Sequence, residues 1–448
     1  MPAKVLIVVF DGLRPDRETA DGMPHLRRFL DEGCWFADAR TVFPSETRVA
    51  AASLVTGCQP ARHGIAANII LDPALPQPRL NTYHGERLAA AGPELLRRPG
   101  LATLLAAAGR RMEVVSTAST GATWLLAPAG AHRYSVHGPA HSAPDGHFDA
   151  VTARIGPVPP AARPNTARID HAVRVLIEDS YPLRDPDLAI LWFSDPDGTW
   201  HFEGIDTPAG RAALAGADAA FGRVLDFAAA RGLTLFALSD HGHITARHRI
   251  DLAAAFREAG FPSGERDLVA SYSGGARIAD PAVAESLAGW LAAQPWCGLV
   301  FSDPRGGRLP EGCFDRAAVG LGQPRATDVI WTLAAEGEGC TYADPLPVGG
   351  GIHGGLRPGE LNHLLALAGP GIRPGRIDGP AGIVDVAPTV LHLLELPASG
   401  MDGRVLAEAL AAGAAAPPAR EEVSAAGRQR LREWRIGRHR YLAEAWRE

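Results

Sequence analysis

Four separated segments of the chain carry side chains that could bind metal ions through oxygen or imidazole nitrogen. In chain order these side chains are Asp11, Asp197, His201, Asp240, His241 and His353. Carboxylates and imidazoles without thiolates favour zinc, manganese or iron at a reactive centre over a structural zinc cluster. Each residue alone could be a helix cap or a solvated side chain, so the prediction depends on all six together. Six ligands are enough for two ions.

The segment 43–57 offers hydroxyl groups that could act as the nucleophile on a substrate held by such ions. The candidates are Ser45, Thr47 and Ser53. A helix is expected from residue 47, and free N–H groups at a helix start attract an anionic phosphate. Ser45 or Thr47 could instead serve only as the N-cap of this helix. The residue types alone leave this choice open.

Short β-rich runs alternate along the chain with Ala/Leu-rich amphipathic segments, and these elements must position the candidate side chains. This alternation predicts an α/β fold with a mostly parallel central sheet and helices on both faces. Strands are expected at residues 4–10, 112–117, 187–194, 233–239 and 363–368. Helices are expected at residues 22–32, 47–55, 100–109, 165–179, 208–231, 279–293, 384–395 and 403–412. Asp11, Asp197 and Asp240 closely follow expected strands, and ligands collect beyond the carboxyl ends of strands in such sheets.

The alternation of predicted strands and helices is interrupted over residues 251–345, which we interpret as an inserted subdomain or cap. Residues 1–250 and 346–448 are then expected to form the catalytic core. The Pro/Ala-rich stretch 413–419 is typical of a linker, and residues 434–438 suggest a hairpin turn near the C-terminus.

Composition excludes several classes of function. The net charge of -6 gives no overall basic field, so a polymeric nucleic acid is disfavoured as substrate. Five cysteines without CxxC spacing argue against a disulfide scaffold and fit a reducing compartment. The apolar run 5–10 is too short for a membrane span. We therefore expect a cytoplasmic protein without a membrane segment, and its oligomeric state is not predicted.

The ordered ligands resemble the metal-binding signature of the alkaline phosphatase superfamily, and the match extends to residues 369–372 and 385–390. This resemblance implies an alkaline phosphatase-like fold with two divalent ions, zinc as first choice and manganese or iron as alternatives. By the same resemblance, one ion takes Asp197, His201 and His353. The other takes Asp11, Asp240, His241 and the nucleophile.

The resemblance also selects the nucleophile. In the phosphodiesterase and phosphonoacetate hydrolase branches, the nucleophilic Thr lies nine residues before a Thr-Gly pair and twenty-one residues before an Asn. Both spacings point to Thr47, given Thr56-Gly57 and Asn68. Asn68 is then expected to bind a phosphoryl oxygen. A sulfatase is disfavoured, because Cys58 follows Gly57, whereas the reactive Cys of sulfatases precedes the helix.

The chain is most similar in pattern to the type I phosphodiesterase/nucleotide pyrophosphatase family. This similarity implies hydrolysis of a small-molecule phosphodiester or nucleotide pyrophosphate through a covalent threonine intermediate. Alternatives are a phosphonoacetate or other phosphonate hydrolase, a phosphomonoesterase, a mutase or a metal-binding pseudoenzyme; the Lys residues of phosphonoacetate hydrolase are missing from 115–120. Arg14 and Tyr83 are candidate substrate-binding residues. His243 is expected to lie behind the ligands or in solvent.

Overall fold

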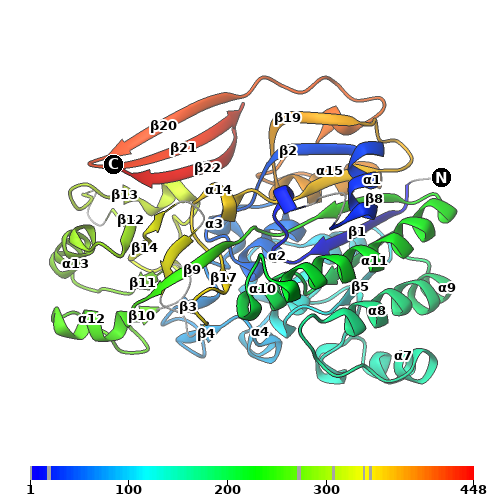
Figure 1. Ribbon diagram of the computed structural model, residues 1–448, viewed down its shortest axis with the longest axis horizontal. Coiled ribbons are helices and arrows are strands. Elements are labelled where there is room, and N and C mark those ends of the chain that lie inside the picture. Colours follow the sequence, from blue (N-terminus) through cyan, green and yellow to red (C-terminus); the bar gives the residue numbers. More distant parts are fainter. Residues whose placement is uncertain (1–2, 18–21, 270–273, 305–307, 337–338, 343–345) are drawn as a thin grey trace.

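The computed structural model describes residues 3–17, 22–269, 274–304, 308–336, 339–342 and 346–448. Its central feature is an eight-stranded sheet with the order β19-β2-β18-β8-β1-β7-β5-β6 (Figure 1). Five neighbouring strands run parallel: β8 (Thr234–Leu238), β1 (Val5–Phe10), β7 (Leu188–Phe193), β5 (Met112–Ser116) and β6 (His132–Ser135). β18 (Leu365–Ala368) is antiparallel to β8 and to β2 (Cys34–Arg40), whereas β19 (Gly375–Gly382) is parallel to β2. The predicted mostly parallel sheet is confirmed.

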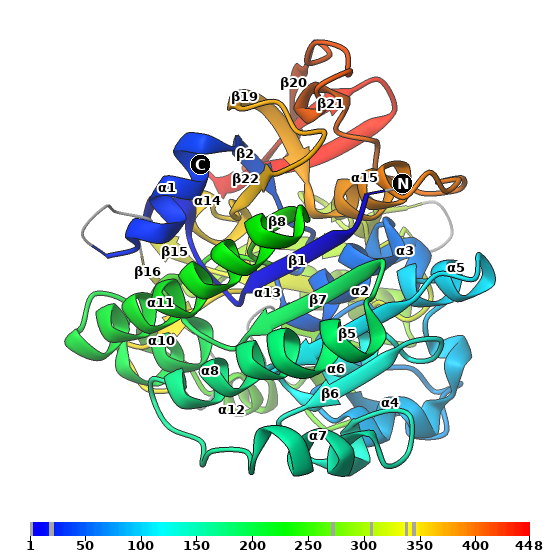
Figure 2. The same cartoon turned by 90° about the vertical axis from the view of Figure 1, so that its right-hand side faces the viewer.

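Helices cover both faces of this sheet. Successive side chains of a strand point to opposite faces, and in β1 both sets are apolar and buried. Val5, Ile7 and Val9 face one hydrophobic cluster, and Leu6, Val8 and Phe10 face another. The first cluster is completed by α2 (Thr47–Thr56), α5 (Leu101–Ala107), α6 (Thr120–Leu126) and α15 (Val386–Leu393). The second is completed by α1 (Pro24–Glu32), α8 (Thr166–Arg174) and α11 (Pro208–Arg231). Figure 2 shows α8 and α11 on one side of the parallel strands, with α2 and α5 on the other.

All five predicted strands are present, and most predicted helices form. The predicted helix 165–179 continues beyond α8 as a π-helical stretch, Val175–Ser180. The helix expected at 403–412 is wrong, because only the 3-10 turn Ala407–Ala409 is present there. Backbone groups of this segment bind other parts of the fold: Leu406 N–H donates to Thr389 Oγ1, and Ala411 N–H donates to Gly371 O. Tertiary hydrogen bonds thus replace the helical ones.

The part of the chain between the core segments forms a lobe at the opposite end of the long axis from the N-terminus (Figure 1). It contains α12 (Leu252–Glu258), α13 (Pro281–Ala293) and a sheet of β10 (Leu268–Val269), β11 (Gly274–Ala276), β14 (Val329–Leu333), β12 (Cys297–Ser302) and β13 (Phe314–Asp315). A second sheet joins β16 (Gly339–Tyr342) to β9 (Ile244–Arg249), which also pairs with β17 (Gly351–Ile352). Because this sheet crosses the expected boundaries, the limits 251 and 345 stay a prediction.

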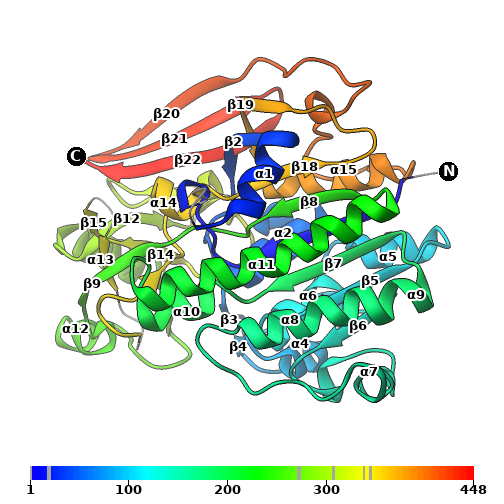
Figure 3. The ribbon, with the colours of Figure 1, turned by 45° about the vertical axis from the view of Figure 1, so that its right-hand side comes forward.

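The C-terminal residues form a three-stranded sheet of β20 (Arg420–Ala426), β21 (Gln429–Ile436) and β22 (His439–Arg447). The turn between β21 and β22 confirms the expected hairpin. Figure 3 shows this sheet extending from β2 and β19 toward the lobe, where Val300 N–H donates to Gln429 Oε1. None of the helices in the described ranges combines the length and apolar character needed to span a bilayer.

Candidate metal centre

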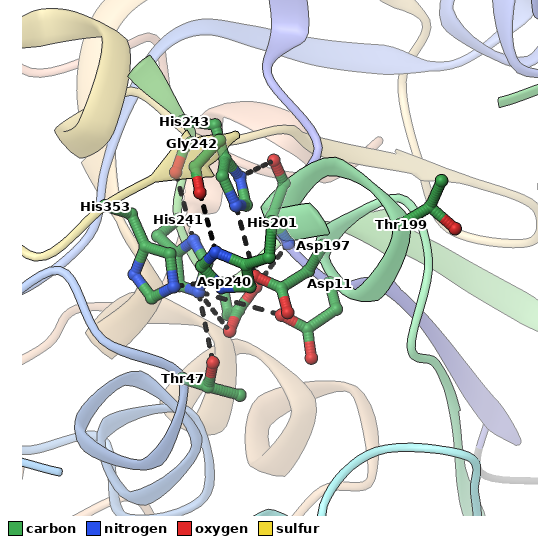
Figure 4. A network of polar contacts seen from close by, with 12 residues as sticks. Asp11, Thr47, Asp197, Thr199, His201, Asp240, His241, Gly242, His243 and His353 are labelled. Atoms are coloured by element: carbon green, nitrogen blue, oxygen red, sulfur yellow. Dashed lines mark hydrogen bonds and ion pairs between the residues drawn. The ribbon is translucent and has the colours of Figure 1, made fainter. Parts of the chain in front are cut away.

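The candidate ligands gather beyond the carboxyl ends of three adjacent parallel strands. Asp11 directly follows β1, and Asp240 and His241 follow β8. Asp197 and His201 lie on α10 (Asp197–Glu203), just after β7. His353 comes from a segment more than a hundred residues further along the chain and directly follows β17 (Gly351–Ile352). All six sequence-predicted ligands are therefore brought together in one site (Figure 4).

One group of ligands is centred on Asp197. The Nε2 atoms of His201 and His353 lie 3.1 and 3.4 Å from Asp197 Oδ1. The i, i+4 spacing within α10 places Asp197 and His201 on one helix face. The two imidazoles therefore converge on the same carboxylate oxygen.

The other group consists of Asp11, Asp240 and His241. His241 Nε2 lies 3.2 Å from Asp240 Oδ2 and 3.6 Å from Asp11 Oδ1. The outer oxygens of both carboxylates are held in place, since Trp192 Nε1 donates to Asp11 Oδ2 at 2.9 Å and Gly12 N–H donates to Asp240 Oδ1 at 2.9 Å. The remaining oxygens, Asp11 Oδ1 and Asp240 Oδ2, face the imidazole.

Each of the three imidazoles is oriented by a backbone carbonyl at its other nitrogen. The Nδ1 atoms of His201, His241 and His353 lie 2.7, 3.1 and 2.7 Å from the carbonyl oxygens of Gly351, Gly242 and Ser45. A carbonyl only accepts, so Nδ1 carries the proton and the Nε2 lone pair faces the site. This is the arrangement by which histidine binds a metal ion.

The charges of the site are poorly balanced by protein groups alone. Burial, with the charges of Asp240 and Asp197, raises the pKa of Asp11 well above its ordinary value. Burial also raises the pKa of Asp240 to about 7. A cation would relieve the repulsion among three neighbouring carboxylates.

The hydrogen-bonding pattern fits divalent ions at both groups. Within the described residues, Asp11 Oδ1, Asp197 Oδ1 and Asp240 Oδ2 are buried and have no hydrogen-bond partner. Buried polar atoms are rarely left unsatisfied, and an ion is one of the few explanations for three together. Oxygen and imidazole donors without thiolate also suit zinc, manganese or iron.

Thr47 is the first residue of α2 and lies beside the group of Asp11, Asp240 and His241. Its Oγ1 is 3.2 Å from His241 Nε2, and its side chain is buried. The N-cap residue is Glu46, which makes no side-chain capping bond. Ser45 is occupied elsewhere, since its Oγ donates to Gly355 O at 2.9 Å and accepts from Gly354 N–H at 3.0 Å. The alternative that Ser45 or Thr47 caps the helix therefore finds no support.

Asn68 is held close to the start of α2, because its backbone N–H donates to the carboxylate of Glu46. The Asn68 side chain is buried, with 4% of its surface exposed. Among the residues that the structure describes, neither Asn68 Nδ2 nor Asn68 Oδ1 has a hydrogen-bond partner. A buried amide without a protein partner is suited to receive a ligand.

The two candidate substrate-binding residues occupy different environments. Tyr83 follows β4 (Arg79–Asn81) and is 48% exposed. Arg14 is buried; its guanidinium donates to both oxygens of Asp16, and Nη1 donates to His243 O at 3.1 Å. A role for Arg14 in substrate binding stays a prediction.

Two residues near the site were not expected as part of it. Arg48, the neighbour of Thr47, is half-buried and lies with its guanidinium carbon 5.6 Å from the centre of the Tyr83 ring. His243 was expected behind the ligands or in solvent; it is fully buried, which excludes the solvent alternative, and its Nε2 lies 3.2 Å from Asp197 Oδ1. The position of Arg48 beside Thr47 was a usable signal in the sequence, whereas the orientation of His243 depends on distant residues.

Comparison with known proteins identifies a family and a fold. The profile described as type I phosphodiesterase / nucleotide pyrophosphatase matches residues 5–293. Among curated proteins, the human bis(5'-adenosyl)-triphosphatase ENPP4 is 39% identical over 72 residues, and the Xenopus laevis protein of the same name is 39% identical over 69 residues. These matches span only 16% and 15% of both chains compared.

Solved structures show the same fold over a much larger part of the chain. Murine ectonucleotide pyrophosphatase/phosphodiesterase 5 aligns with a TM-score of 0.64 and 20% identity, covering 89% of this chain and 97% of the murine one. An inactive variant of that protein in complex with AMP aligns with a TM-score of 0.65 and 18% identity, covering 90% and 97%. The family profile covers more than half of the 448 residues, and the protein therefore belongs to the type I phosphodiesterase/nucleotide pyrophosphatase family.

Proposed function

We propose that this protein hydrolyses a small phosphodiester or nucleotide pyrophosphate through a covalent intermediate on Thr47, with two divalent ions bound beside it. The observation that carries this proposal is the position of Thr47 Oγ1, 3.2 Å from His241 Nε2, at the edge of two groups of metal-binding side chains. A helix start, an unpartnered amide and these two groups together form a site suited to phosphoryl transfer.

The residues that would hold the ions are divided between the two groups. Asp197, His201 and His353 would bind one ion, and Asp11, Asp240, His241 and Thr47 would bind the other. Zinc is the first choice, with manganese or iron as alternatives. When bound, two such ions supply positive charge that lowers the pKa of the nucleophile and of water and stabilises the leaving oxygen.

The reaction proceeds in two displacements at phosphorus. Thr47 Oγ forms a bond to phosphorus while the bond to the leaving-group oxygen breaks; the hydroxyl proton passes to solvent, and the leaving oxygen takes a proton from solvent. Water then attacks the same phosphorus, the bond to Thr47 breaks, and the hydroxyl is restored. The chain's task in both steps is to hold Thr47 in line with the bond that breaks.

Negative charge that develops on phosphorus-bound oxygen is received by two features of the chain. The first N–H groups of α2 carry the partial positive charge of the helix start. The Asn68 amide, which is buried and without a partner among the described residues, can donate to the same oxygen. Donors that are fixed before the reaction stabilise the transition state more than donors that must reorganise.

The names of the relatives and the exposed Tyr83 side chain support the proposed substrate class. The curated relatives are named as triphosphatases of bis(5'-adenosyl) compounds, and the murine neighbour binds AMP. Here, the exposed Tyr83 ring could stack on a base, and the Arg48 guanidinium beside it could bind a further phosphoryl oxygen. Phosphonoacetate, other phosphonates and phosphomonoesters also present a phosphorus atom to the nucleophile and are the competing substrates.

A substrate panel with added zinc or manganese tests this proposal. The panel contains bis-p-nitrophenyl phosphate, a nucleotide p-nitrophenyl ester, a bis(5'-adenosyl) triphosphate, p-nitrophenyl phosphate, phosphonoacetate and a sulfate ester. The proposal predicts the highest kcat/KM for a diester or nucleotide pyrophosphate. Leading activity on phosphonoacetate or the monoester would move the protein to the corresponding alternative, and leading activity on the sulfate would overturn the choice of reaction.

A further inference from the structure

His243 is arranged around Asp197 in the same way as the two predicted imidazole ligands. The Nε2 atoms of His201, His243 and His353 lie 3.1, 3.2 and 3.4 Å from Asp197 Oδ1. The distance from His243 thus falls between the other two. Figure 4 shows the ring pointing into the site from the segment that follows His241.

The hydrogen bond at Nδ1 fixes the proton of the His243 ring there, so Nε2 presents a lone pair. His243 Nδ1 lies 3.0 Å from the carbonyl oxygen of Gly12, which can only accept, so Nδ1 carries the proton. In the described part of the chain, His243 Nε2 is buried and has no hydrogen-bond partner. A lone pair therefore faces the Asp197 carboxylate, and two acceptors at this distance repel unless a cation lies between them.

The surroundings of His243 are shaped to hold its ring in this place. A Cβ atom on Gly12, whose φ is +70°, would lie 2.3 Å from His243 Cε1. A Cβ atom on Gly351 would lie 2.9 Å from His243 Cδ2. Trp200 packs edge-on against the ring at a centroid distance of 5.4 Å, and Arg14 holds the His243 carbonyl. Two glycines are thus required where the imidazole approaches.

We propose that His243 is a fourth protein ligand of the ion at Asp197, in addition to His201 and His353. This inference rests on the proposed two-ion site. Three imidazoles and a carboxylate complete a four-coordinate shell, so a substrate oxygen or water must enter as a fifth ligand.

Nuclear magnetic resonance of the full chain with labelled histidine and cadmium tests the assignment directly. Metal analysis first establishes how many ions bind, and a protein that binds none would contradict the proposed function itself. With two ions bound, we expect a scalar coupling from cadmium to the Nε2 of four histidines, including His243. Such coupling passes only through a coordinate bond, so its absence at His243, with coupling at His201 and His353, would overturn this inference alone.

A pair of variants gives an independent readout. His363 is also fully buried, its Nδ1 lies 2.8 Å from Leu364 O, and its Nε2 has no hydrogen-bond partner among the described residues. It is therefore a matched control outside the site. His243→Ala should weaken binding of one of the two ions by at least about tenfold in chelator competition, whereas His363→Ala should leave both affinities unchanged. Thermal unfolding of the metal-free variants separates lost ligation from lost folding, and equal ion affinities in folded His243→Ala and wild type would contradict the assignment.

Discussion

Thr47 Oγ1 lies 3.2 Å from His241 Nε2 although 194 residues separate them in the chain. Ser45, just before α2, also contacts the segment that carries His353. The carbonyl oxygen of Ser45 accepts a hydrogen bond from His353 Nδ1 at 2.7 Å. The hydroxyl of Ser45 donates to Gly355 O and accepts from Gly354 N–H. The nucleophile proposed here is therefore held next to both groups, by a side-chain contact with His241 and by hydrogen bonds of the preceding Ser45 to His353, Gly354 and Gly355. Such preorganisation is what in-line attack on phosphorus requires.

Replacement of Thr47 should separate catalysis from folding. Thr47→Ala removes the covalent route, so kcat should fall by about a thousandfold or more, which corresponds to roughly 4 kcal/mol. Thr47→Ser keeps the hydroxyl and should retain measurable activity. Steady-state kinetics and thermal unfolding of each variant are the measurements.

Ser45→Ala is the matched control for Thr47. It removes hydrogen bonds to the His353 loop and should cost about 1–3 kcal/mol of stability, with most of the activity retained. An active Thr47→Ala together with an inactive Ser45→Ala would show that Ser45 carries the reaction.

Asp197 and Asp195 form a second matched pair, two residues apart; Asp195 is buried, and the Asp197 side chain is 16% exposed. Asp195 Oδ1 accepts from the hydroxyl and N–H of Thr199, and its Oδ2 accepts from Asn165 N–H, so it has structural partners. Asp197→Asn should reduce kcat/KM by at least about a hundredfold and weaken binding of one ion. Asp195→Asn should instead lower the unfolding temperature with two ions still bound. The reverse pattern would assign the ligand role to Asp195.

Asn68 should matter for the reaction and not for folding. Asn68→Ala removes a donor to the developing charge, so kcat should fall by roughly a hundredfold to a thousandfold. Because the Asn68 side chain has no partner in the described residues, the metal-free variant should unfold at the same temperature as wild type or higher. A clear loss of stability with normal kcat would mean that Asn68 is a structural residue.

Tyr83 should affect only substrates that carry a base. Tyr83→Leu should raise KM for a nucleotide p-nitrophenyl ester by about threefold to tenfold, which is the worth of one aromatic contact. KM for bis-p-nitrophenyl phosphate should change little. Trp35, which packs under Arg27 and Arg376 at the start of β2, provides a comparable aromatic away from the site. If Trp35→Leu raised the nucleotide KM equally, base stacking on Tyr83 would be excluded as the cause.

The sequence was sufficient to predict the parts of the fold whose pattern is local. β1, β7 and β8 are apolar runs buried on both faces, and a carboxylate closely follows each of them. The ends of these strands were therefore sufficient to predict that Asp11, Asp197 and Asp240 lie close together. The strands that were not predicted lack this pattern: β2 is half-buried and contains Asp38, and the edge strand β19 contains glycines and a proline.

The sequence could not predict features that depend on distant backbone. The imidazole of His243 is placed by Gly12 and Gly351, which approach it from opposite parts of the chain. No local spacing reports such a contact. The helix predicted at 403–412 does not form for a related reason, because hydrogen bonds to Thr389 and Gly371 override its helical composition.

Acid-quench trapping tests the central claim most directly. The enzyme would be mixed with a nucleotide p-nitrophenyl ester, quenched in acid within one turnover, digested and analysed by mass spectrometry. The proposed mechanism predicts a nucleotidyl group attached to the peptide that contains Thr47, and its loss in Thr47→Ala. A modified Ser45, or rapid turnover with no modified peptide at any time point, would contradict a covalent intermediate on Thr47.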